Sequence, residues 1–92
     1  MIEHIDAESP GLYVVRTQGS EHVWNPQEGW YVRKPGRRGH WSMSDFPNHR
    51  RVHWTRVERW PVVGQTFRVI LTGDTPWHQS STIREIEEVV PA

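Results

Sequence analysis

The residues best suited to chemistry lie in a basic, aromatic segment between residues 33 and 56. This segment carries seven Arg and Lys residues against a single acid, Asp45, which gives it a net charge of +6. Phosphate groups need cations, and the bases of single-stranded nucleic acids stack on aromatic rings. Trp and Arg are also enriched among the residues that dominate the energetics of protein interfaces. The partner-binding surface that we predict consists of Arg37, Arg38, Trp41, Arg50, Arg51 and Trp54.

Two classes of partner fit this surface, and we favour a protein, such as a protein of a host cell. Nucleic acid is the alternative, but the chain has a net charge of zero, whereas nucleic-acid-binding domains usually are basic overall. Self-association is a third hypothesis, because the acidic ends, residues 1–32 and 57–92, complement the basic middle of another copy. The simplest alternative is a solvated loop that balances the acidic N-terminal third.

A metal site is a weaker hypothesis for the same segment. Asp45, His49 and His53 follow one another at intervals of four residues, and His-x3-His is a spacing used by zinc sites. This spacing places the side chains on one face only in a helix, which Pro47 would interrupt. We therefore expect exposed histidines in a cationic loop, with no bound metal and no cofactor.

A catalytic site is also a weak hypothesis. The closest grouping of nucleophilic and basic side chains comprises Asp74, His78, Ser80 and Ser81. A nucleophile and its base must meet in space, and closeness in sequence does not ensure this. The chain contains no nucleophile elbow, phosphate-binding loop or glycine fingerprint. We interpret the acidic residues near the C-terminus as a solvated face: Glu85, Glu87 and Glu88. We expect a protein that is not an enzyme.

The elements that must position these residues are predicted to be short β-strands, rich in β-branched and aromatic residues. Asn25–Gly29 has the Pro and Gly of a turn and predicts a hairpin between the second strand and the third. Trp77 follows a Gly-Asp-Thr-Pro turn and is assigned to it. The predicted strands cover residues 12–17, 21–24, 30–33, 52–60 and 66–72.

The C-terminal segment fits two structures. Thr82 and Glu85 have the spacing of a capping box, which would begin a helix with Ile83, Ile86 and Val90 on one stripe. The other structure is a closing strand over residues 81–87. We favour the strand, because the segment is rich in β-branched residues and a small sheet needs a partner for its edge.

These elements predict an all-β fold, a small bent antiparallel sheet or an SH3-like barrel of five to six strands. A long central loop spans about residues 34–51. Residues 1–10 are expected to form a flexible N-terminal arm, and residues 11–92 a single small β domain. The expected core consists of Val14, Val23, Val32, Val57, Phe67, Val69, Leu71 and Ile83, with Trp24 and Trp60.

The chain has six tryptophans and no cysteine in 92 residues. A domain without disulfides or thiolate metal sites depends on packing, and the aromatic residues are the main source of it. The strand tryptophans, Trp24, Trp30 and Trp60, are expected to serve the core, which leaves Trp41, Trp54 and Trp77 for a partner. The sequence shows neither a signal peptide nor an apolar stretch that could cross a membrane, so we expect a cytoplasmic protein.

Four short motifs occur in a characteristic order: Gly19-Ser20, Arg33–Gly36, Pro61–Gly64 and Ser80–Glu87. This order resembles small uncharacterised β-domain proteins of actinobacteria and their phages, over about residues 11–88. The resemblance implies a phage or actinobacterial origin, a strand at the C-terminus and, for a phage protein, a location in the cytoplasm of the bacterial host. It implies no catalytic residue, because this group has no known activity. The many tryptophans and the Arg/His-rich middle depart from the usual pattern of the group.

Overall fold

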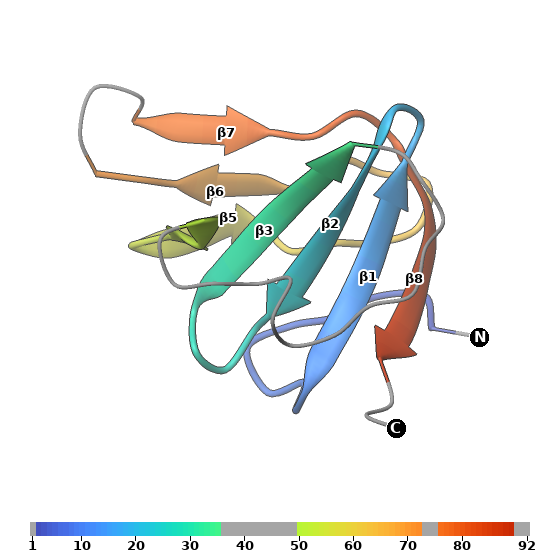
Figure 1. The fold of residues 1–92 in the computed structure, drawn as a ribbon, viewed down its shortest axis with the longest axis horizontal. Helices are drawn as coiled ribbons and strands as arrows, with labels where there is room; N and C mark the ends of the chain where they lie inside the picture. The colour runs from blue at the N-terminus through green and yellow to red at the C-terminus, as the bar shows by residue number, and fades with distance from the viewer. Residues whose placement is uncertain (1, 36–49, 73–75, 90–92) are drawn as a thin grey trace.

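The computed structural model describes residues 2–35, 50–72 and 76–89. These residues form eight antiparallel β-strands and no α-helix (Figure 1), which confirms the all-β prediction. No helix among them is long and apolar enough to cross a membrane. The strands are β1 (Leu12–Thr17), β2 (Ser20–Asn25), β3 (Trp30–Pro35), β4 (Val52–His53), β5 (Arg56–Arg59), β6 (Arg68–Ile70), β7 (Trp77–Gln79) and β8 (Ile83–Val89).

Five of the strands form one sheet in the order β4-β3-β2-β1-β8. The predicted turn at residues 25–29 joins β2 to β3, and the Gly29 N–H donates to the Asn25 carbonyl over 2.9 Å. Gly29 has a φ of 80°, a backbone conformation that glycine adopts without steric cost. β8 pairs with β1, so the C-terminal segment is a strand, as the interpretation that we favoured predicts.

The other three strands form a second sheet in the order β5-β6-β7. The prediction of one continuous strand over residues 52–60 is wrong, because this segment forms two strands. The chain leaves the first sheet after β4 and enters the second sheet with β5. The Trp54 N–H donates to the carbonyl of Gly29, in the turn that joins β2 to β3 of the first sheet, and the next N–H, of Thr55, donates to the carbonyl of Ile70 in the second. A continuous apolar pattern does not reveal such a change of sheet. The assignment of Trp77 to a turn is also wrong, since it begins β7.

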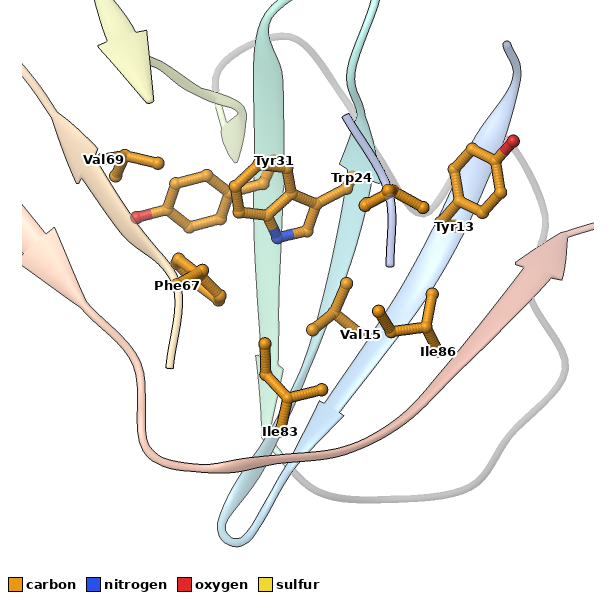
Figure 2. Packing of buried hydrophobic residues seen from close by; sticks show 9 residues of the cluster. Tyr13, Val15, Trp24, Tyr31, Phe67, Val69, Ile83 and Ile86 are labelled. Carbon is orange, nitrogen blue, oxygen red and sulfur yellow. The ribbon is translucent and has the colours of Figure 1, made fainter. Parts of the chain in front are cut away.

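The two sheets share one core, built around aromatic rings. The Trp24 indole is fully buried, with its ring centre 4.6 Å from that of Trp54, 4.8 Å from Phe67 and 5.6 Å from Tyr31. Figure 2 shows side chains from both sheets pointing toward one another around this indole. The described strands form two packed sheets and do not close into a barrel, and a likeness to SH3 domains in particular stays a prediction. The buried members of this core are Ile5, Tyr13, Val15, Trp24, Tyr31, Phe67, Val69, Ile83 and Ile86.

The five-stranded sheet is buried on both faces. Residues alternate along a strand, so Val14 points away from Tyr13 and Val15. A second cluster therefore lies on the face opposite the main core, and consists of Val14, Val23, Trp30 and Val32. The prediction that Val14, Val23 and Val32 share one core with Phe67 is therefore wrong, because the sheet separates the two clusters. Three other expected core residues, Val57, Trp60 and Leu71, are only partly buried against the main core.

Residues 2–10 are not the loose arm that the sequence predicts. Ile5 is only 1% exposed and belongs to the main core. Its N–H donates to the Pro61 carbonyl over 3.1 Å, and Ile2 forms a bridge with Ile86 on β8. The sequence suggests a flexible arm because Ile2 and Ile5 lie among polar residues. No local pattern indicates that these two isoleucines pack against a core formed by distant residues.

Candidate functional site

The structure does not bring the predicted surface together. Arg37, Arg38 and Trp41 lie outside the described residues. The three described members lie apart: Arg50 is exposed, the Arg51 guanidinium lies 4.2 Å from the centre of the Trp30 ring, and Trp54 packs in the main core. Because Trp30 and Trp54 contact opposite faces of the five-stranded sheet, Arg51 and Trp54 do not share one surface. Their role in partner binding stays a prediction.

Trp77 is the only large hydrophobic side chain of the described residues that is exposed, with 47% of its surface accessible. It starts β7, at one edge of the three-stranded sheet. Trp77 is one of the tryptophans expected to be available for a partner, although it is not part of the predicted surface. The signal that could have identified it is the alternation in Trp77-His78-Gln79, which puts His78 inward and the indole outward.

The outer face of the three-stranded sheet gathers Trp77 with three arginines. In this sheet Val57, Val69 and His78 form one cross-strand row, and Val69 is buried in the main core. The neighbouring rows therefore point outward. We call this surface the Trp77 face; its two rows are Arg56, Ile70 and Trp77, and Arg59, Arg68 and Gln79.

Contacts on the Trp77 face hold Arg68 against the indole. The Arg68 guanidinium carbon lies 4.4 Å from the centre of the Trp77 ring, a distance that permits a cation–π interaction. The same guanidinium forms an ion pair with Glu58, in which Nε and Oε1 are 3.1 Å apart. Arg59 donates from Nη1 to the Thr66 hydroxyl over 2.8 Å. Arg56 is exposed and has no hydrogen bond or ion pair with any other described residue. The Trp77 face therefore carries three cations, one anion and one exposed indole, and Arg68 is the cation that contacts the indole.

Two histidines lie behind this sheet. His22, on β2, is 2% exposed, and burial lowers its pKa to about 4, with further lowering by His78 and Arg33. Burial also lowers the pKa of His78, which is next to the Tyr31 ring at 6.0 Å. Both imidazoles are therefore neutral near pH 7, so they support the sheet without adding charge to its outer face.

The residues considered for catalysis have structural contacts. The Ser80 hydroxyl donates to the Ser81 carbonyl over 2.7 Å and accepts from the Phe67 N–H over 3.0 Å. These bonds connect the end of β7 to the chain before β6, which is the position of a structural serine. Asp74 lies outside the described residues.

The histidine spacing considered for metal is only partly described. His53 is exposed on β4, whereas Asp45 and His49 lie outside the described residues. Within residues 2–35, 50–72 and 76–89, no group of three or more His, Cys, Asp or Glu side chains could hold a metal ion.

Comparisons with known proteins add no further site. No protein-family model, no curated protein and no solved structure matches this chain. The resemblance to small actinobacterial and phage proteins therefore stays a prediction, and the function must be argued from the Trp77 face itself.

Proposed function

We propose that this chain is a non-enzymatic interaction module that binds a protein partner through the Trp77 face. The observation that carries the proposal is the exposed Trp77 indole with the Arg68 guanidinium against it. Trp and Arg are the residues most often found where a protein interface gains its energy. The ladder of β6 and β7 also holds both side chains in place, so little conformational entropy would be lost on binding.

A protein partner fits this surface better than nucleic acid. The Glu58 carboxylate lies within 3.1 Å of Arg68, where it would repel a phosphate approaching the indole. The chain as a whole has no net charge to attract a polyanion. An acidic or amphipathic protein surface can instead place a carboxylate against Arg56 or Arg59 and an apolar group on Trp77.

The test is affinity capture with three purified forms of the chain. The bait forms are the wild type, a Trp77→Ser/Arg56→Ser variant, and a control in which Arg33→Ser removes one exposed arginine elsewhere. Bacterial lysate proteins and untagged copies of the chain itself are offered, and quantitative mass spectrometry measures the bound proteins. We expect at least one protein to bind the wild type and the control but not the Trp77 face variant. Identical captures by all three forms would contradict the proposal.

The nucleic-acid alternative has its own measurement. Fluorescence anisotropy with labelled single-stranded DNA, double-stranded DNA and RNA at low salt should show no binding that depends on Trp77. Binding that falls steeply with salt and is lost in Trp77→Ser would support nucleic acid as the ligand of the Trp77 face instead.

A further inference from the structure

A second surface with the opposite charge lies along β8. A cavity of about 520 Å³ lies beside this strand and is lined by Ile2 and Val63 together with residues 84–88. Ile2, Val63 and Ile86 supply apolar lining, and Glu85, Glu87 and Glu88 supply carboxylates. We call this cavity the β8 groove. Its size lies within the range of about 300–1,000 Å³ that is typical of sites for drug-sized groups.

The β8 groove lies at a sheet edge that is only partly covered. β8 is the last strand of the five-stranded sheet, and among the described residues its outer side is paired at Ile83, by backbone hydrogen bonds with Gly64 and Gln65, and at Ile86, by the bridge with Ile2. The rest of this edge can attract another chain. The carboxylates favour a partner with exposed cations.

The carboxylates of the groove differ in how far they are already neutralised. Arg16, on β1, approaches Glu87 to 2.7 Å and Glu85 to 3.4 Å. Glu88 is exposed and has no ion pair with a described residue. An incoming arginine would therefore find Glu88 available, while Arg16 keeps Glu87 in place.

We propose that the protein partner of the Trp77 face is a second copy of this chain, whose β8 groove receives the Trp77 indole. The inference rests on the proposed function and names its partner. It joins the only exposed large hydrophobic side chain of the described residues to an apolar groove, and it joins Arg56 and Arg59 to Glu85 and Glu88. Opposite charges on two such patches make them complementary and steer their encounter.

The position of the two surfaces determines the kind of assembly. β7 and β8 lie at opposite ends of the molecule (Figure 1), so one chain cannot bring its own two surfaces together. The contact uses different surfaces on the two copies and is therefore heterologous, which produces a ring or an open chain of copies rather than a two-fold dimer. Because exposed charges contribute, salt weakens it.

Sedimentation velocity of the full chain over a range of concentrations tests this proposal. We expect species larger than the 10.9 kDa monomer at low salt, and fewer of them at high salt. Trp77→Ser, Arg56→Glu and Glu88→Lys should each weaken association about tenfold or more. The matched controls Arg33→Glu and Glu8→Lys make the same charge changes on exposed residues outside both surfaces and should associate like the wild type. Circular dichroism verifies that each variant is folded.

Mixing two variants makes the test specific for a heterologous contact. A Trp77→Ser chain keeps an intact β8 groove, and a Glu88→Lys chain keeps an intact Trp77 face. Each alone should be monomeric, whereas the mixture should form heterodimers and nothing larger, because one surface of each kind remains. No recovery on mixing, or equal effects of the controls, would overturn the proposal.

The failure of this inference is distinguishable from failure of the proposed function. A wild-type chain that is monomeric at every concentration, but still captures a different protein in a Trp77-dependent way, overturns self-association alone. A chain that is monomeric and captures nothing through Trp77 contradicts both.

Discussion

His22 is the residue whose burial has the clearest consequence. Its imidazole lies edge-on to Phe67, with ring centres 5.0 Å apart, and neither ring nitrogen has a well-formed hydrogen bond among the described residues. A charged imidazole is costly at such a position, which explains why burial lowers the pKa of His22 to about 4. The nearby Val15 backbone favours the protonated form, but burial outweighs it.

The lowered pKa of His22 predicts a loss of stability in acid. Between about pH 6.5 and about pH 4 the unfolded chain binds a proton on His22 that the folded chain does not bind. The contribution of His22 should therefore lower the free energy of unfolding by up to about 1.4 kcal/mol for each unit by which the pH falls within this range. Above about pH 6.5, His22 should make the free energy of unfolding no more dependent on pH. His78 shifts in the same direction and adds to the effect.

Urea unfolding at several pH values measures this dependence. A His22→Phe variant keeps an aromatic ring in the core but has no titratable nitrogen. We expect its unfolding free energy to depend less on pH than that of the wild type. Equal slopes for the two proteins between about pH 6.5 and about pH 4.5 would show that His22 does not control acid stability.

Trp24 and Trp77 offer a matched comparison between a buried and an exposed tryptophan. Trp24→Ala removes the ring that contacts Tyr31, Trp54 and Phe67, and should cost about 3–5 kcal/mol of stability. Because small domains are only marginally stable, a loss of this size should move the unfolding midpoint of the variant to a much lower urea concentration. Trp77→Ala should change stability by about 0.5 kcal/mol or less, apart from any effect on association. Urea unfolding followed by circular dichroism measures both values.

At the scale of elements, Arg16 connects three strands of the five-stranded sheet. From β1 it reaches Glu21 on β2 at 3.4 Å and Glu87 on β8 at 2.7 Å. Glu21 is buried, so its carboxylate depends on Arg16 for compensation. The ion pair thus determines which β8 residues face β1, next to the shift in register between Arg16 and Thr17.

Removing Arg16 should destabilise the sheet. Arg16→Gln leaves Glu21 buried without its cation, and we expect a loss of about 3 kcal/mol, near the lower limit for buried pairs because the Arg16 side chain is 21% exposed. The matched control is Arg84→Gln, which neutralises an exposed arginine on β8 and should have little effect. Adding Glu21→Gln to the Arg16 variant should restore part of the loss. If Arg16→Gln and Arg84→Gln unfold at the same urea concentration, Arg16 does not compensate the charge of Glu21 in this way.

At the scale of the whole molecule, the fold separates charge. The Trp77 face carries three arginines and Glu58, and the β8 groove at the other end carries three carboxylates and Arg84 (Figure 1). A chain with zero net charge therefore presents one basic end and one acidic end. This separation is the basis for the association between copies that we propose.

Association predicts that thermal stability depends on protein concentration. Any partner that binds only the folded state raises the melting temperature, and the partner that we propose is the chain itself. Differential scanning fluorimetry at low salt should give a melting temperature that rises over about a hundredfold range of concentration for the wild type. The Trp77→Ser variant should melt at the same temperature throughout that range. A concentration-independent wild type would contradict self-association.

The sequence by itself determined the class of structure, because this depends on local chemistry. The β-branched and aromatic run at Leu12–Thr17, the Pro and Gly of the turn before Trp30, and the alternation of Phe67 and Val69 each specify their conformation within a few residues. Six tryptophans in a chain without cysteine likewise pointed to an aromatic core.

Only the tertiary structure decided which surface each element faces. Trp54 packs against the main core because the chain changes sheets at Thr55, and Ile5 is buried because residues 2–10 return to that core. Val14 lies on a different face from Val15 although both are buried. Trp77 is exposed because it points to the outer face of the three-stranded sheet, on the edge strand β7. Alternation along a strand indicates which side chains share a face, but which face is covered depends on contacts between residues far apart in the sequence.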